Sequence, residues 1–480
     1  MKRIVSRATF LFAAMSVVAP ETDAALVPQF TPLYSFTNAD GRTPLSGLIL
    51  VSNVLYGTTA EGGQSNGVVF AMNTDGSDYT VLHSFAVTVS GTNFDGARPS
   101  ADLLLSGNTL YGTTLQGGSS GAGTVFAVNT DGSDFRLLHQ FTALDPGMGT
   151  NSDGAFPSCP LIVSGGILYG TASSGGPWGY GTLFRINTNG TAFTNLHGFG
   201  DNPYLGTLPY GGLVLCSGVL YGTSSGNTYW QGPTFGSIFA VGTDGTGFTN
   251  LHLFAGYPSD GAYPMASLIV SSNRLYGTTF KGGSWDIGTV FAISTDGTGY
   301  EILHDFIGAS YLGGEYLSAS LLLSDRTLYG TAISGGAYNG VGTIFALNTD
   351  GAGFTTLCAF ALDPIGGYHY DTTGGYNPHS DLVLLGNKLY GSASAGGTAN
   401  YGSIFAFSLT PSMKIDRTGD QVGISWPTWG QHFTLETTTN LPFGAWSEVT
   451  NEITAAGVSY LTTNSLDAGT RFFRLHARFE

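Results

Sequence analysis

Five histidines occupy the same position of a repeated segment and are the first candidates for chemistry. They are His83, His139, His197, His252 and His304, found in segments such as YTVLHSF at 79–85 and YEILHDF at 300–306. A metal site needs several ligands within about 2 Å of one ion. Equivalent positions of successive repeats point away from one another in a closed array, so these histidines are not expected to converge. The pattern favours packing or a hydrogen bond to a neighbouring loop.

Four aspartates recur in an Asp-Gly-x-x-Pro motif, each with a proline four residues later. They are Asp40, Asp95, Asp153 and Asp260. An active site normally occurs once in a chain, whereas this motif repeats, so structural turns are favoured over catalysis or ligand contacts. Non-repeated carboxylates are the better candidates for catalysis, and Glu61, Asp286, Glu315 and Asp371 are of this kind. A carbohydrate-active enzyme would need two such groups facing the same space.

Two Asp-Gly segments resemble calcium loops in composition. They are Asn73-x-Asp75-Gly76-x-Asp78 and its counterpart at 129–134. The glycine arrives too early for an EF-hand loop, so hairpin turns are the main prediction and calcium binding is the weaker alternative. No other cofactor is expected, because the sequence contains no nucleophile elbow, zinc signature, phosphate loop or dinucleotide fingerprint.

The elements that position these residues follow from a repeat of 52 to 61 residues, marked by seven Leu-Tyr-Gly triplets. In the fifth copy, four short apolar segments alternate with turn residues: ASLIVS at 266–271, RLYGTTF at 274–280, GTVFAIS at 288–294 and YEILHDF at 300–306. Runs of this length, rich in β-branched and aromatic residues, predict four antiparallel strands. A repeat of this length is typical of β-propeller blades.

The first and last copies are incomplete. The segment FTPLYSF at 30–36 is a fourth strand that follows nothing, and GSIFAF at 402–407 is a third strand with no successor. In a closed ring these two segments must pair, which would build one blade from both ends of the array. The sequence therefore predicts an all-β fold, a seven-bladed propeller of four-stranded antiparallel blades over 30–409. A β-solenoid is the competing architecture.

Two further regions flank the repeats. Residues 1–24 have the layout of a secretory signal peptide, with Lys2, Arg3 and Arg7 before an apolar run, although a membrane anchor is the alternative. Residues 411–480 do not follow the repeat, and their alternating strand-like segments, with Trp426 and Trp446 as core candidates, predict a small β-sandwich. No segment after residue 24 is apolar for long enough to span a bilayer, so no membrane span is expected in the mature chain.

The charge balance bears on the class of partner. The chain has 16 Lys and Arg against 32 Asp and Glu, a formal net charge of −16. Nucleic acid binding depends on basic side chains that displace counterions, so nucleic acid is excluded as a partner. The three cysteines are scattered, which favours small buried side chains over disulfides.

The repeat unit also carries a family resemblance. Units such as LYGTTFKGGSWDIGTVFAISTDGTGYEILHDF resemble the GloVer tandem repeat of secreted bacterial proteins, over about residues 30 to 409. The resemblance implies an exported, propeller-like protein of unassigned biochemical role, secreted or held at the cell surface. Members of that family often carry C-terminal anchoring segments, whereas this chain lacks an evident hydrophobic tail followed by a basic stop.

The irregular residues lie in two families of longer loops, after the second and fourth strands, which must emerge on one face of a meander. Aromatic residues there can stack on sugar rings or anchor a protein partner. The predicted ligand-binding residues are Trp178, Tyr204, Tyr210, Tyr229, Trp230, Phe235, Tyr257, Trp285, Tyr311 and Tyr370. The leading hypothesis is an exported, non-enzymatic binding or scaffold protein for a glycan or surface protein. The alternatives are a carbohydrate-active enzyme, a hydrolase or a lyase, and a structural cell-envelope component.

Overall fold

The computed structural model describes most of the chain from residue 30 onward. The described residues are 30–90, 92–201, 206–226, 234–308, 313–336, 340–360 and 374–409, followed by 414–418, 421–427, 433–438, 447–449, 453–456, 459–465 and 472–477. The chain divides into two compact units, of which the larger comprises Thr31–Val383 and Tyr390–Ala406. The described residues contain strands and turns but no helix, and hence no helix that could cross a membrane.

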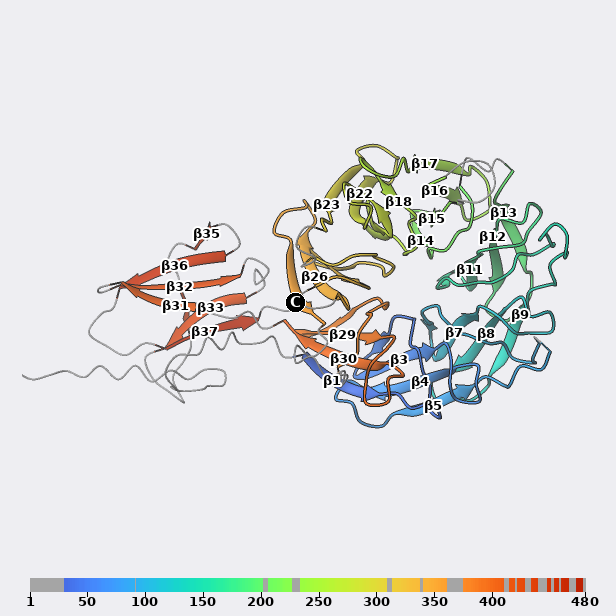
Figure 1. Cartoon of the computed structure of the whole chain (residues 1–480), viewed down its shortest axis with the longest axis horizontal. Coiled ribbons are helices and arrows are strands. Elements are labelled where there is room, and N and C mark those ends of the chain that lie inside the picture. Colours follow the sequence, from blue (N-terminus) through green and yellow to red (C-terminus); the bar gives the residue numbers. More distant parts are fainter. Residues whose placement is uncertain are drawn as a thin grey trace, which may run out of the picture. The chain divides into compact units, whose positions relative to one another are not determined.

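The larger unit is a ring of four-stranded antiparallel sheets, which are the blades of a propeller (Figure 1). Blades 1 to 3 are β2 (Ile49–Val51), β3 (Val54–Thr59), β4 (Val68–Asn73) and β5 (Thr80–Ser84); β6 (Leu104–Ser106), β7 (Thr109–Thr114), β8 (Thr124–Asn129) and β9 (Arg136–Gln140); and β10 (Ile162–Ser164), β11 (Ile167–Ala172), β12 (Thr182–Asn187) and β13 (Thr194–Gly198). Blades 4 to 6 are β14 (Val214–Cys216), β15 (Val219–Ser224), β16 (Ser237–Gly242) and β17 (Thr249–Leu253); β19 (Ile269–Ser271), β20 (Arg274–Thr279), β22 (Thr289–Ser294) and β23 (Glu301–Asp305); and β24 (Leu322–Ser324), β25 (Thr327–Ala332), β26 (Thr343–Asn348) and β27 (Thr355–Ala359). The labels in Figure 1 place β11 and β14 toward the middle of the ring and β5, β9, β13 and β17 at its rim.

The seventh blade joins the two ends of the repeat array. Its strand order is β1 (Phe30–Ser35), β30 (Ser403–Ser408), β29 (Lys388–Ala393) and β28 (Val383–Leu385). Directly after β1, the Phe36 N–H donates a hydrogen bond to the Gly402 carbonyl at 3.0 Å. With this blade the ring has the seven four-stranded antiparallel blades that the repeat predicts.

The Leu-Tyr-Gly triplet has a packing reason in every blade. In blade 2, a Cβ added at Gly112 would lie 2.5 Å from Cζ of Phe126, which is the residue opposite it in the β7–β8 register. The same clash with the facing phenylalanine recurs at Gly57, Gly170, Gly222, Gly277, Gly330 and Gly391. Each of these phenylalanines is fully buried. The glycine is therefore required because an aromatic ring of the next strand packs against its Cα.

Neighbouring blades are joined at one backbone position, which we call the junction position. It is the third residue after the aspartate of the Asp-Gly-x-x-Pro motif, or the aligned residue in the three blades that lack this motif. Its φ is 55° to 60° in all seven blades: Thr43, Arg98, Phe156, Leu208, Tyr263, Tyr316 and Asn377. Each N–H donates to a carbonyl of the preceding blade at 2.7 to 2.9 Å. A left-handed conformation costs a non-glycine residue of the order of 1 kcal/mol, so the hydrogen bond offsets local strain. The bond from Thr43 to the Tyr401 carbonyl joins blades 7 and 1 as the others join their neighbours.

The C-terminal strands form two sheets. The first has the order β31 (Lys414–Thr418), β32 (Gln421–Pro427), β36 (Ser459–Ser465) and β35 (Thr454–Ala456), and the second has β34 (Ser447–Glu448), β33 (Phe433–Thr438) and β37 (Phe472–Ala477). Ile424, Trp426, Leu435 and Val449 form one buried cluster with Phe473 packed against it. Trp426 is thus a core residue as expected, while Trp446 lies outside the described residues. The β-sandwich and its boundaries stay a prediction.

Candidate functional site

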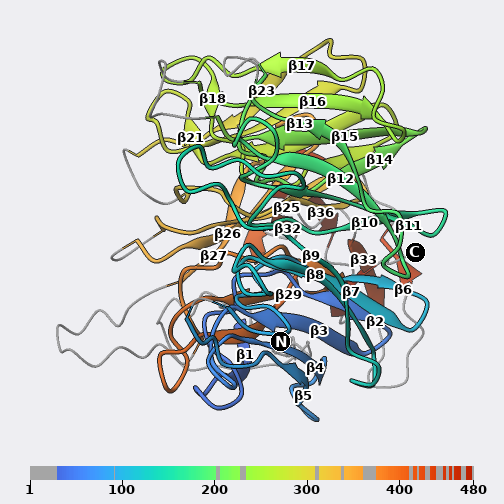
Figure 2. The same cartoon turned by 90° about the vertical axis from the view of Figure 1, so that its right-hand side faces the viewer.

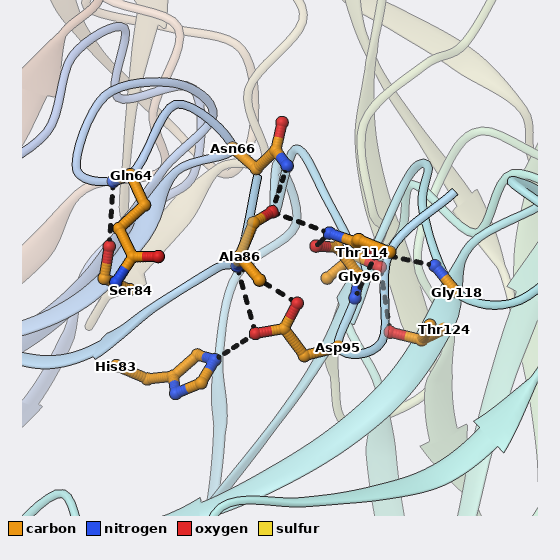
Figure 3. A network of polar contacts seen from close by, with 11 residues as sticks. Gln64, Asn66, His83, Ser84, Ala86, Asp95, Gly96, Thr114, Gly118 and Thr124 are labelled. Atoms are coloured by element: carbon orange, nitrogen blue, oxygen red, sulfur yellow. Dashed lines mark hydrogen bonds and ion pairs between the residues drawn. The ribbon is translucent and has the colours of Figure 1, made fainter. Parts of the chain in front are cut away.

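The repeated histidines and aspartates meet one another. His83, His139 and His252 each place Nε2 2.9 to 3.0 Å from the carboxylate of Asp95, Asp153 and Asp260 respectively. In the remaining blade with such an aspartate, the Tyr34 hydroxyl takes the place of the histidine and donates to Asp40 at 2.7 Å. Figure 3 shows that Asp95 also accepts from the backbone N–H of Ala86, just after the strand. The hydrogen bond to a neighbouring loop that the sequence suggested is thus present in three histidine repeats.

Each histidine also contacts the next blade through its ring face. The five imidazoles stack on Phe135, Phe193, Phe248, Tyr300 and Phe354 with centroid distances of 3.6 to 3.8 Å and interplanar angles of 12° or less. A stacked pair buries a large apolar area at the outer strand, where two blades meet. The histidine position is therefore a structural contact between blades, and no two of these histidines share a site.

The two histidines without an aspartate differ electrostatically. The place of the aspartate in the motif after His304 is taken by Gly313, which offers no carboxylate. Burial lowers the pKa of His304 to about 4, although nearby Asp305 opposes this effect, and burial also lowers the pKa of His197. Both imidazoles are therefore neutral at pH 7 and act as flat packing groups.

Asp260 has the largest number of donors in this group. Its carboxylate accepts from His252, from the Ala255 N–H at 2.9 Å and from the Tyr300 hydroxyl at 2.6 Å, the last reaching across from the next blade. Burial alone would raise the pKa of Asp260, but the hydrogen bonds from His252, Tyr300 and Ala255 outweigh it and hold the pKa below its usual value. The ionised form is thus the one that the fold stabilises.

Replacing Asp260 with Asn should lower the stability of the propeller by about 1–3 kcal/mol at pH 7, because the amide cannot accept from all of these donors. Since the pKa is lowered in the folded state, the contribution is present above the ordinary aspartate pKa and is lost as pH falls through the folded value. Urea denaturation at pH 7 and at pH 3 measures the difference. Asp244→Asn, in an exposed hairpin, is the matched control, and equal midpoints for the two variants at pH 7 would contradict the assignment.

The two long-loop families meet at the same end of each blade. Backbone bridges connect them between Arg42 and Glu61, Ala97 and Gln116, Ala155 and Ser174, Glu315 and Ser334, and Tyr376 and Ala395. In blade 5 the same contact forms a small sheet of β18 (Gly261–Ala262) and β21 (Lys281–Gly282), visible in Figure 2. We call this end of the ring the long-loop face.

Exposed apolar side chains gather on the long-loop face. In the described part of the propeller, eight of the ten exposed large hydrophobic residues lie in these loops: Val87, Val89, Phe94, Met148, Trp178, Tyr257, Trp285 and Ile307. The other two, Val81 and Leu253, lie on outer strands, and none lies in the tight hairpins of the opposite face. Scattered exposed residues are ordinary, but a bias this strong toward one face is not.

Phe94 is the most exposed of them, at 93%. It stands between two anchored residues, because Asp95 bonds to His83 and the buried Asn93 makes hydrogen bonds to Ala86, Gly96 and Gly118. Its backbone is held in place while the ring faces solvent. Phe94 is not among the residues predicted from the sequence, although it is an aromatic residue in a motif that otherwise carries Ala or Ser at this position.

The predicted aromatic residues divide into three groups. Trp178, Tyr257 and Trp285 are exposed, each more than half. Phe235 and Tyr210 are partly buried, and Phe235 packs against the core cluster that blades 4 and 5 share. The remaining five lie outside the described residues: Tyr204, Tyr229, Trp230, Tyr311 and Tyr370.

A second polar feature lies where the blades converge. In each blade a buried leucine comes directly before the first strand. The seven residues that precede these leucines form what we call the axial ring: Gly47, Asp102, Pro160, Gly212, Ser267, Ser320 and Asp381. Four of its members donate their N–H to a side-chain oxygen of the following blade, as from Gly212 to Ser267 at 3.0 Å and from Ser320 to Asp381 at 2.6 Å. Asp102 and Asp381 belong to blades 2 and 7, which are not neighbours, and they approach each other across Gly47 of blade 1. Such a contact is possible only near the axis of the ring.

Of the non-repeated carboxylates singled out by sequence, the three that the structure describes do not form a pair. Glu61 forms an ion pair with Arg42 at 2.9 Å, and Asp286 accepts from the Gly282 N–H and lies 3.7 Å from Lys281. Burial raises the pKa of Glu315, and Asp371 lies outside the described residues. Asp102 and Asp381 are the carboxylates that the structure brings together.

The Asp-Gly segments form hairpin turns. Oδ1 of Asp75 accepts from both the N–H and the hydroxyl of Ser77, and Asp131 accepts in the same way from Ser133. No group of three His, Cys, Asp or Glu side chains placed to hold a metal ion occurs among the described residues. Calcium binding stays a prediction.

The ring of four-stranded antiparallel blades defines the protein as a seven-bladed β-propeller. The chain belongs to the Gloeobacter/Verrucomicrobia repeat family, whose model matches residues 23–235 and 228–416. This confirms the family that the LYG, TDG and LHxF motifs indicated.

Comparison with solved structures gives distant likenesses. An oligogalacturonate lyase in complex with manganese is 10% identical over 81% of this chain and 95% of its own, with a TM-score of 0.49. PorZ, a bacterial surface component of the type-IX secretion system of Porphyromonas gingivalis, is 11% identical over 90% of this chain and 59% of its own, with a TM-score of 0.48. TolB from Acinetobacter baumannii is 12% identical over 59% of this chain, with a TM-score of 0.35, and the match spans 58% of TolB. No curated protein matches the chain.

Proposed function

We propose that this propeller is an exported binding protein that recognises a glycan or a surface protein through its long-loop face. The observation that carries the proposal is the gathering of exposed apolar side chains on that face and their absence from the described hairpins of the opposite face. Trp178, Tyr257, Trp285 and Phe94 supply exposed, flat apolar rings, and the Tyr257 hydroxyl and the two indole N–H groups add polar edges. Sugars present the same combination of apolar faces and hydroxyl edges.

The aromatic side chains stand beside other apolar groups of the same face. A Cβ at Gly179, next to Trp178, would lie 3.3 Å from the Met148 carbonyl, so the two loops adjoin. Trp285 lies beside Gly308, which follows the exposed Ile307. Two separate apolar contact points on one face suit an extended ligand better than a compact one.

A glycan array with the whole protein tests the proposal. If the array identifies a ligand, replacing both Trp178 and Trp285 with Ala should weaken binding by about tenfold or more, because truncating an aromatic anchor typically costs more than 1 kcal/mol. The matched control is Val81→Ala with Leu253→Ala, which removes exposed apolar groups from the outer strands. Absence of binding to every glycan, or equal loss in both double variants, would refute recognition of glycans by this face.

The carbohydrate-active enzyme gains no support from the axial aspartates. Glycoside hydrolases place their two carboxyl groups about 5–9.5 Å apart to leave room for the sugar and water. Asp102 and Asp381 instead hydrogen-bond to each other. This pair lacks the space that such a reaction requires.

A further inference from the structure

Asp102 and Asp381 approach each other beside Gly47, the axial-ring residue of blade 1, which has no side chain. A Cβ added to Gly47 would lie 2.8 Å from Oδ2 of Asp102 and equally 2.8 Å from Cβ of Asp381, so the two side chains fill the space that the glycine leaves. Oδ1 of Asp102 accepts from the Gly47 N–H, and Oδ1 of Asp381 accepts from the Ser320 N–H. Blades 6, 7, 1 and 2 are therefore connected through this pair.

The pair needs a proton to be stable. A hydrogen bond joins the two carboxyl groups, and two carboxylates can hydrogen-bond to each other only if one of them is protonated. Burial and the charge of Asp381 raise the pKa of Asp102 well above its ordinary value, and the bond from Gly47 opposes this only in part. Both residues are half-buried rather than sealed, so the proton can exchange with solvent.

The surrounding segments supply no cation to replace that proton. The segment of blade 1 contributes Leu45 and Ser46, and that of blade 6 contributes Ser318 and Ser320. His379 precedes Asp381 by two residues and contacts the Ser318 hydroxyl through Nδ1 at 3.3 Å, while burial lowers its pKa so that it is neutral at pH 7. Arg98, four residues before Asp102, occupies the junction position, and among the described residues no ion pair joins Arg98 or either aspartate to a partner.

We propose that Asp102 and Asp381 share one proton and that the hydrogen bond between them is a pH-sensitive contact at the axis of the ring. This contact stabilises the packing of blades 7, 1 and 2, and loss of the proton weakens it. Loss of the proton leaves two carboxylates in contact and removes the hydrogen bond between them. The two carboxylates then repel each other across Gly47 of blade 1. Blade 1 directly follows blade 7, which contains both ends of the repeat array. The device is independent of the ligand that the long-loop face recognises.

The sign of the pH dependence follows from the raised pKa. Between the ordinary aspartate pKa of 3.8 and the pKa of the pair, the folded protein keeps a proton that the unfolded chain has lost. Stability from the pair is therefore complete below 3.8 and declines as pH rises through this window, by at most about tenfold in the folded-to-unfolded ratio per pH unit. Asp102→Asn resembles the protonated carboxyl group, so this decline should be absent from the variant.

The test compares urea denaturation of the wild-type chain, Asp102→Asn and Asp381→Asn from pH 4 to pH 9. Each variant should gain stability relative to the wild-type chain as pH rises, whereas Asp244→Asn, which removes the same charge from an exposed hairpin, should show no such gain. Infrared absorption provides a second readout that does not depend on unfolding. The wild-type chain should keep a protonated carboxyl band above the pH range in which exposed carboxyl groups ionise, and either substitution should remove that band.

Two results would overturn the proposal. One is a wild-type spectrum in which every carboxyl group ionises over the pH range of exposed carboxyl groups. The other is a constant stability difference between the wild-type chain and the two axial variants over the whole pH range, which would mean that the aspartates serve only as hydrogen-bond acceptors for Gly47 and Ser320.

Discussion

A chain that begins at residue 38 is expected to aggregate or to unfold well below the melting temperature of a chain that begins at residue 25. The shorter chain lacks β1, so β30 becomes an edge strand with an exposed row of hydrogen-bonding groups. It also lacks Phe36, which is fully buried and packs edge-on against Phe70 with centroids 5.5 Å apart. Removing a buried phenylalanine costs about 3–5 kcal/mol by itself, a large share of a typical stability of 5–15 kcal/mol.

The first strand also contacts blade 1 through a tyrosine pair. The Tyr34 ring stacks on Tyr79 at 4.0 Å, and the Tyr34 hydroxyl donates to Asp40. Size-exclusion chromatography and thermal melting of the two chains measure the effect. Tyr34→Phe in the longer chain should cost much less than the deletion, because it removes one hydrogen bond and keeps the stacking. If the chain from residue 38 melts like the longer one, the strand does not close the ring.

The second large effect is expected from Gly112→Ala. The new methyl group would lie 2.5 Å from Cζ of Phe126, whose fully buried ring has no room to move. Overpacking of this kind typically costs about 1–3 kcal/mol, and a larger side chain should prevent the blade from forming. Gly147→Ala is the matched control, because its nearest neighbour would be at 3.4 Å, an ordinary contact in a loop. Equal denaturation midpoints for the two variants would show that the phenylalanine can give way.

The sequence was informative about the blades because their signals are local. Asp-Gly turns, the Leu-Tyr-Gly triplet and short β-branched runs each specify a hairpin or a strand within a few residues. The missing partner of Phe30–Ser35 then indicated the order of blade 7, which needs only the count of strands. The His–Asp contacts could be anticipated as a bond to a neighbouring loop, but the matching of His83 with Asp95 depends on the path of that loop.

The axial pair and Phe94 could not be found in this way. Asp102 and Asp381 are separated by four intervening blades in sequence and become neighbours only because the ring closes, so no local pattern connects them. Phe94 was overlooked because exposure is a property of the folded surface, and most aromatic residues that the structure describes are buried or partly buried. Trp178, Tyr257 and Trp285 could be selected from the sequence because they lie where the loops diverge between copies, and all three are exposed, while their role in binding stays a prediction.

The junction position has a consequence for how this protein can change over generations. The contact between blades there is made by backbone atoms, and the seven side chains are Thr, Arg, Phe, Leu, Tyr, Tyr and Asn, with no chemistry in common. A substitution at one junction therefore leaves the geometry of the other six unaltered, provided that the new residue tolerates the left-handed backbone. Selection can therefore vary these seven positions one at a time without changing the backbone contacts that join the blades.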